Sequence, residues 1–67
     1  MEINAKSIGR KLVALRGEKT QEKVAKDLNI SISALSMYEN GERIPRDNIK
    51  IRIAAYYKRS ICDIFFS

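Results

Sequence analysis

The sequence predicts a single all-α domain spanning residues 1–67, and three observations support this prediction. The chain has 67 residues, which is the size of one small domain. Only three glycines and one proline interrupt it, and they are Gly9, Gly17, Gly41 and Pro45. Between these positions, apolar residues recur at the spacing of an amphipathic helix. We therefore expect helices of ordinary length, joined by short turns.

Two helices are expected in the first half of the chain. Residues 5–16 form the first, with Asn4 as its N-cap and Gly17 at its end, because glycine readily adopts positive φ. Residues 21–28 form the second, with Thr20 as its N-cap. The inward faces of the two helices consist of Ile8, Leu12, Leu15, Val24, Ala25 and Leu28.

A third helix, over residues 32–40, follows the second after a turn of three residues, 29–31. Asn29 suits this turn because asparagine tolerates positive φ, and Ser31 can cap the new helix. Gly41 should end it. The inward residues of this segment are Ile30, Leu35 and Tyr38.

Two further helices are expected near the end of the chain. Residues 47–58 form the fourth helix, although the alternation of Ile49, Ile51 and Ile53 also fits a strand, which remains an open alternative. A short fifth helix begins after Ser60, which can act as its N-cap. The apolar residues that we expect to face inward are Ile49, Ile53, Ala54, Tyr56, Tyr57, Ile61, Ile64 and Phe65.

Residues 21–40 have the spacing of a helix-turn-helix. The small Ala25 stands where the two helices must cross, and Asn29 stands at the turn. Apolar residues occupy the positions that join such a pair: Val24, Leu28, Ile30, Leu35 and Tyr38. The alternative interpretation is a generic antiparallel helix pair.

The charge of the chain favours a polyanionic partner. The net charge is +5 and the isoelectric point is about 9.7, and lysine and arginine displace the counterions that condense on nucleic acid phosphates. A solvated basic surface is the alternative. Basic residues are spread evenly along the chain, so a phosphate-binding surface would depend on folding.

Other function classes find little support in the composition. Cys62 is the only cysteine and histidine is absent, so we expect no Cys/His metal site, no cofactor, no intrachain disulfide and no enzyme activity. An unpaired cysteine suits a reducing cytoplasm. No apolar run approaches the roughly 20 residues that cross a bilayer, and the N-terminus lacks the apolar core of a secretory signal.

Four segments resemble the phage-repressor-like helix-turn-helix family, also called the Cro/CI or xenobiotic response element family. They are IGRKLVALR, TQEKVAKDL, ISISALSMYENGERIP and SICDIFF, and the similarity runs from Ile8 to Phe66. The resemblance implies a compact five-helix domain that regulates transcription in bacteria or their phages. It also implies that the third helix enters the major groove of a double-stranded DNA operator and that the protein binds as a homodimer.

The same resemblance assigns roles to individual residues. The base-facing positions of the third helix are Ile32, Ser33, Ser36 and Met37. The residues expected at the DNA phosphates are Gln21, Asn40, Arg43, Arg46 and Lys50. Arg16 and Glu39 match an ion pair that joins the first and third helices in the family.

Three features depart from the family. The connection before Thr20 lacks the GL that precedes TQ elsewhere, which predicts a reoriented first helix. Asp47 and Lys50 replace apolar residues, which predicts a rotated fourth helix. The base-facing residues carry no long hydrogen-bonding side chain, so we expect modest direct readout that favours A·T pairs through Ile32 and Met37.

Two questions about partners remain open at this stage. The candidates for a dimer surface are Tyr56, Tyr57, Phe65 and Phe66. The alternative function is a protein-interaction module of the same fold, similar to an antirepressor, in which the apolar face of the third helix docks a protein. Gln21, Asn40 and the positive net charge favour DNA over that alternative.

Overall fold

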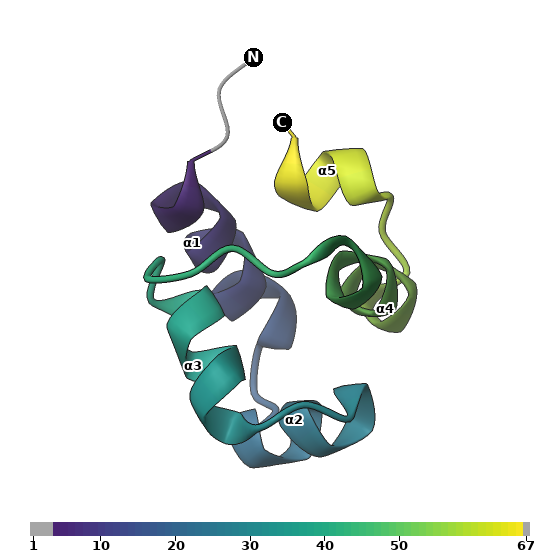
Figure 1. Ribbon diagram of the computed structural model, residues 1–67. Helices are drawn as coiled ribbons and strands as arrows, with labels where there is room; N and C mark the ends of the chain where they lie inside the picture. The colour runs from purple at the N-terminus through teal and green to yellow at the C-terminus, as the bar shows by residue number, and fades with distance from the viewer. Residues whose placement is uncertain (1–3, 67) are drawn as a thin grey trace.

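The computed structural model describes residues 4–66 and confirms the all-helical prediction. Its helices are α1 (Ala5–Arg16), α2 (Gln21–Leu28), α3 (Ile32–Glu39), α4 (Asp47–Tyr57) and α5 (Ile61–Phe65). Figure 1 shows α1 packed beside α3, α2 at one end of the molecule and α5 at the opposite end. Residues 49–53 are part of α4, so the strand alternative for this segment is wrong.

Side-chain caps determine where the helices begin. The Asn4 side chain accepts hydrogen bonds from the backbone N–H groups of Lys6 and Ser7, at 3.0 and 3.2 Å. Three other helices have the predicted N-caps, each of which accepts a bond from a first-turn N–H, and these are Thr20, Ser31 and Ser60. Such bonds satisfy N–H groups that have no partner within the helix.

The helix ends agree less closely with the sequence prediction. Asn29 and Gly41 have the expected positive φ, at 59° and 75°. Two helices end one residue earlier than predicted, because Asn40 and Lys58 are C-caps. Lys58 adopts φ 57°, a conformation that glycine or asparagine usually supplies.

The core lies between the five helices, and each of them contributes to it. Its buried residues are Ile8, Leu12, Val24, Ala25, Leu28, Leu35, Tyr38, Ile53, Ala54, Ile64 and Phe65. Arg52 adds a polar link, because its Nη1 donates to the carbonyl oxygen of Leu28 at 3.0 Å and so joins α4 to the end of α2. No helix among residues 4–66 has the length and apolarity that crossing a bilayer requires.

Gly9 permits the close packing of α1 on α3. A Cβ atom added at Gly9 would clash with the carbonyl oxygen of Glu39 and lie 2.9 Å from that of Tyr38. Only glycine therefore fits at this crossing without a shift of the backbone. From the sequence alone, Gly9 is expected only to interrupt a helix, and nothing in its neighbours indicates this packing role.

Candidate nucleic-acid interface

Helix α3 turns one face to the core and the other to solvent. Leu35 and Tyr38 are buried, whereas Ile32 is 47% exposed and Ser33 is also exposed. Ser36 and Met37 are half-buried. The side chains that the resemblance assigned to base reading thus lie on the outer side of the helix, at its N-terminus and along its middle.

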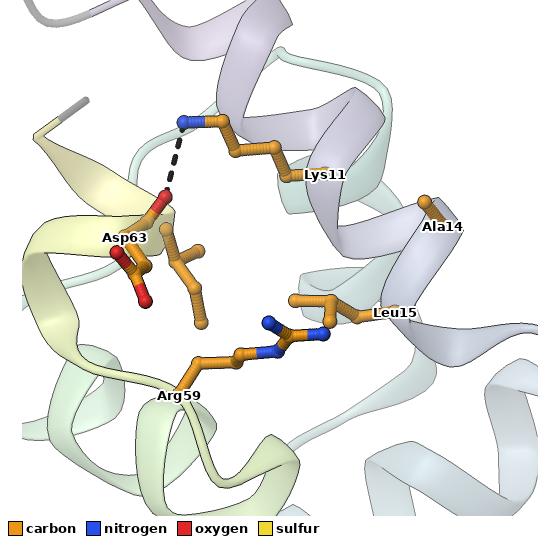
Figure 2. A pocket seen from close by; sticks show the side chains of 6 residues that line it. Lys11, Ala14, Leu15, Arg59 and Asp63 are labelled. Carbon is orange, nitrogen blue, oxygen red and sulfur yellow. Dashed lines mark hydrogen bonds between the residues drawn. The ribbon is translucent and has the colours of Figure 1, made fainter.

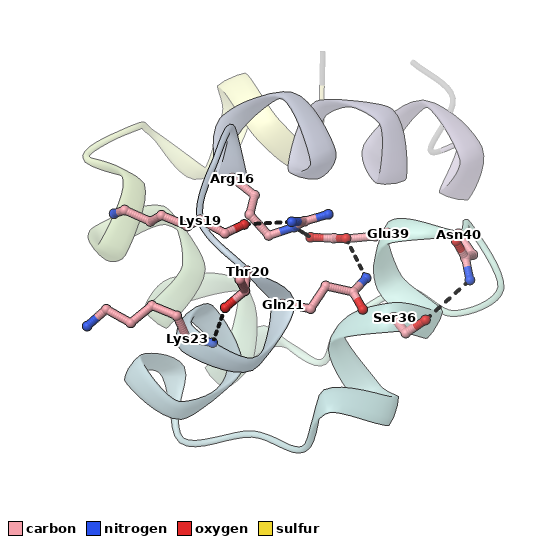
Figure 3. Close-up of polar contacts among 8 residues, drawn as sticks. All are labelled: Arg16, Lys19, Thr20, Gln21, Lys23, Ser36, Glu39 and Asn40. Carbon is pink, nitrogen blue, oxygen red and sulfur yellow. Dashed lines mark hydrogen bonds and ion pairs between the residues drawn. The ribbon is translucent and has the colours of Figure 1, made fainter.

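A buried carboxylate anchors the inner side of α3. Glu39 accepts a hydrogen bond from Arg16 Nε at 2.8 Å and another from Gln21 Nε2 at 2.8 Å (Figure 3). Its side chain is only 1% exposed. Because the three residues come from α1, α2 and α3, this cluster fixes α3 relative to its two neighbours.

The electrostatics of the cluster follow from this geometry. The hydrogen bond to Glu39 raises the pKa of Arg16 above its usual value, and the nearby carboxylate charge adds to the effect. A buried charge is costly unless it is paired and hydrogen-bonded, and Glu39 meets both conditions. Arg16 also donates from Nη1 to the carbonyl oxygen of Lys19 at 2.7 Å, so the short connection between α1 and α2 is compatible with the ion pair.

Gln21 stands at the first position of α2 with one amide N–H directed to Glu39. A glutamine amide has two N–H donors. The bond to Glu39 therefore orients the side chain and leaves a second donor for an anion. The backbone N–H groups at the start of α2 favour an anion in the same region.

The residues that follow α3 form a polar, exposed segment. Asn40 Nδ2 lies 3.4 Å from Ser36 Oγ and 3.3 Å from a carboxylate oxygen of Glu42, and Figure 3 shows the first of these contacts. Arg43 and Arg46 are exposed in the loop before α4. Glu42, which is not among the residues predicted from the sequence, places a negative charge among the candidates for phosphate contact.

Lys50 is placed differently from the other candidate cations. It is buried, with Nζ 3.8 Å from Asp47 Oδ1 and 5.1 Å from the centre of the Phe66 ring. The side chain therefore faces α5 and not the loop that carries the two arginines. Its aliphatic stem can occupy an apolar position of α4 while its ammonium group reaches the rim. We exclude Lys50 from the proposed phosphate-contacting residues.

The candidate residues of the dimer surface differ in their exposure. Phe65 is 2% exposed and completes the core, so it offers little surface to a partner. Tyr56 donates from its hydroxyl to Asp27 Oδ2 at 2.7 Å, and the Tyr57 hydroxyl is buried. The Tyr56 hydroxyl is thus bonded within the monomer, whereas the Tyr57 hydroxyl is enclosed without a hydrogen-bond partner among the described residues. Phe66 is half-buried and retains some exposed surface.

An exposed apolar groove lies between α4 and α5. Ile51 is 58% exposed and lines this groove of about 310 Å³, together with Asp47, Lys50, Ile61 and Phe66. The signal for Ile51 was present in the sequence, because this isoleucine falls outside the helical stripe of Ile49 and Ile53. Because the exposed Ile51 stands between the core-facing Ile49 and Ile53, isoleucine occupies every second position, as in a strand.

Comparison with known proteins identifies the arrangement. A family model described as "Helix-turn-helix" matches residues 11–64. No curated protein matches the chain. The matched range contains all of α2 and α3, the Glu39 cluster and the loop arginines.

Proposed function

The chain belongs to the Cro/CI-type helix-turn-helix family of DNA-binding regulators, and we propose that it is a sequence-specific repressor. It inserts α3 into the major groove of a double-stranded DNA operator and binds there as a homodimer, in the cytoplasm of a bacterial cell. The observation that carries this proposal is the division of α3 into a solvent-facing side and a side anchored through the buried Glu39.

The exposed side of α3 suits a modest form of direct readout. Ile32 and Met37 can contact the C5-methyl group of thymine, and serine hydroxyls can bond to several base edges. A bidentate side-chain contact is worth about 1–3 kcal/mol of discrimination, and the short or apolar side chains here contribute less each. Much of the specificity therefore rests on DNA shape and deformability.

Phosphate contacts supply most of the affinity. The proposed contacts come from Gln21, Asn40, Arg43 and Arg46, which flank α3 in the fold. Such contacts fix the register and orientation of a protein on the duplex but carry no sequence information directly. They also make the logarithm of the affinity fall linearly with the logarithm of salt concentration.

Pairing of two chains would double the number of bases that are read. Two-fold related recognition helices lie about 34 Å apart, which is one turn of the duplex. The groove of Ile51, Ile61 and Phe66 replaces the earlier candidate surface, because it combines exposed apolar area with a place on α4 and α5 that leaves α3 free.

Selection of bound sequences from a random pool of duplex DNA tests the proposal. The expected result is a palindromic motif with half-sites one helical turn apart and with A·T pairs where Ile32 and Met37 contact the bases. The variant Ile32→Ala should flatten the preference at one position of each half-site. Recovery of random sequences by the unmodified protein would refute sequence-specific binding.

The exposed Ile32 also suits a protein-interaction module, which is the second candidate function. A titration of DNA affinity against salt separates the two. A regulator that contacts phosphates shows a steep linear decrease in log affinity with log salt. A protein-interaction module shows weak DNA binding at all salt concentrations, and that result would favour the second candidate.

A further inference from the structure

A second cavity lies between α1 and α5, outside the proposed DNA-binding surface. It has a volume of about 230 Å³, and Figure 2 shows the side chains that line it. They are Lys11, Ala14, Leu15, Arg59, Asp63 and Ile64. None of these residues has a role in the proposed contacts with DNA or in the groove of Ile51.

Positive side chains outnumber negative ones around this cavity. Lys11 Nζ donates to the backbone carbonyl oxygen of Asp63 at 3.1 Å, and the lining carries two positive side chains, Lys11 and Arg59, against the single carboxylate of Asp63. Arg59 extends across the cavity toward Leu15 (Figure 2). Its guanidinium makes no hydrogen bond or ion pair with any residue of the range 4–66. The cavity therefore combines an apolar floor with an excess of positive charge in its lining.

We propose that this cavity binds a small aromatic carboxylate, with the ring on Ala14, Leu15 and Ile64 and the carboxylate on the Arg59 guanidinium. An arginine fork can donate two parallel hydrogen bonds to a carboxylate, which gives strength and a defined orientation. The lining has two positive side chains and one negative side chain, which favours a singly charged anion over a neutral or doubly charged molecule.

The volume limits the size of the ligand. An apolar cavity of about 150 Å³ accepts benzene, so a cavity of about 230 Å³ has room for one ring and a short acid group. Pockets for drug-sized molecules begin at about 300 Å³. Phenylacetate, which is one ring with a short acid group, is of suitable size and is the probe.

Binding should also stabilise the fold. The ligand would contact α1 and α5, and a molecule that binds only the folded state raises the free energy of unfolding. The thermal midpoint of the free protein should therefore rise with phenylacetate concentration. DNA plays no part in this stabilisation. A failure to observe the stabilisation would therefore leave the proposed regulator function untouched.

The test is a titration of the full chain with sodium phenylacetate at constant ionic strength, followed by two-dimensional NMR. We expect saturable shifts of the resonances of Ala14, Leu15 and Ile64. The variant Arg59→Gln should weaken the affinity about tenfold or more, because it loses the charge-assisted bonds. The matched control Lys26→Gln removes one positive charge from the exposed surface of α2 and should bind as the unmodified protein does.

Two further measurements make the test specific. Phenylacetamide, which has the same shape but no charge, should bind at least about tenfold more weakly. Ala14→Leu should abolish binding by filling the floor, and it should leave the circular dichroism spectrum unchanged because Ala14 is exposed on a helix. The proposal is overturned if phenylacetate causes no saturable shifts, if the amide binds equally well, or if Arg59→Gln binds with unchanged affinity.

Discussion

Glu42 places a carboxylate beside an amide that we assign to phosphate contact. Its Oε2 lies 3.3 Å from Asn40 Nδ2, so it both occupies this donor and repels a phosphate. Glu42→Gln should raise DNA affinity about fivefold at low salt, because two like charges about 4 Å apart in water repel by about 1 kcal/mol. Fluorescence anisotropy with a selected operator measures the change.

The matched control is Asp63→Asn, which makes the same change of charge on α5. It should alter the affinity by much less than Glu42→Gln does, because Asp63 lies on α5 and not in the segment that follows α3. An equal gain from both variants would show that net charge alone determines the effect. In that case Glu42 has no local role.

Tyr57 links the stability of the fold to alkaline pH. Burial raises the pKa of its hydroxyl to about 12, and the charge of Glu39 contributes as well, whereas an unperturbed tyrosine titrates near pH 10. The folded state therefore favours the neutral hydroxyl. The contribution of this preference to the free energy of unfolding is fully present below about pH 10. It is lost as the pH rises from about 10 toward 12.

Tyr57→Phe should remove that part of the alkaline destabilisation. At neutral pH its stability should stay the same or rise by up to about 1 kcal/mol, because the buried hydroxyl has no hydrogen-bond partner among the described residues. Tyr56→Phe is the control and should lower stability, since the Tyr56 hydroxyl donates to Asp27. Urea denaturation at pH 7 and above pH 10 measures both variants. A large loss at pH 7 for Tyr57→Phe would contradict this interpretation.

The residues of the candidate site differ in how far the sequence could reveal them. Arg16 and Glu39 match the family motif, and their side chains meet in the structure. The burial of Lys50 and Phe65 could not be predicted, because a sequence pattern does not indicate how deeply α5 covers α4. A lysine can bury its stem against aromatic rings, and an aromatic residue near a chain end can complete a core.

At the scale of the elements, helix starts were easier to predict than helix ends. Four of the five predicted starts have a capping side chain whose geometry is local, so the sequence alone locates them. The start of α4, after Arg46, has no side-chain cap. The end of α4 depends on Lys58 in the left-handed region, and lysine carries no local signal for that conformation. The helix end is closed by backbone hydrogen bonds from the N–H groups of Lys58 and Arg59 to the carbonyl oxygens of the last turn.

The contact of α1 with α3 yields a prediction that opposes helix propensity. Alanine is favoured over glycine within a helix by about 1 kcal/mol, yet Gly9→Ala should destabilise the protein by about 1–3 kcal/mol, as overpacking typically does. The added methyl group would clash with the backbone of α3. Arg10→Ala, one residue further along and exposed, should change stability by less than about 0.5 kcal/mol. Thermal denaturation distinguishes the two, and a stabilised Gly9→Ala would show that the two helices pack less closely.

The size of the whole molecule gives pairing a thermodynamic benefit. A chain of 67 residues can bury only a limited core, and a second copy would cover apolar surface that the monomer exposes. The candidate groove offers Ile51, Ile61 and Phe66 on one side of the fold, and α3 stays accessible. Pairing there would contribute both to stability and to the number of bases read.

Ile51→Lys tests the pairing surface without disturbing the monomer. Ile51 is 58% exposed, so a lysine should leave the fold and the circular dichroism spectrum unchanged. Sedimentation at micromolar concentration should show a dimer for the unmodified protein and a monomer for the variant, since two lysines would meet at a two-fold axis. Val13→Lys is the control, because Val13 is 45% exposed on α1 and lies outside the groove. If Ile51→Lys remains dimeric while Val13→Lys becomes monomeric, the pairing surface lies on α1, and the groove between α4 and α5 has another use.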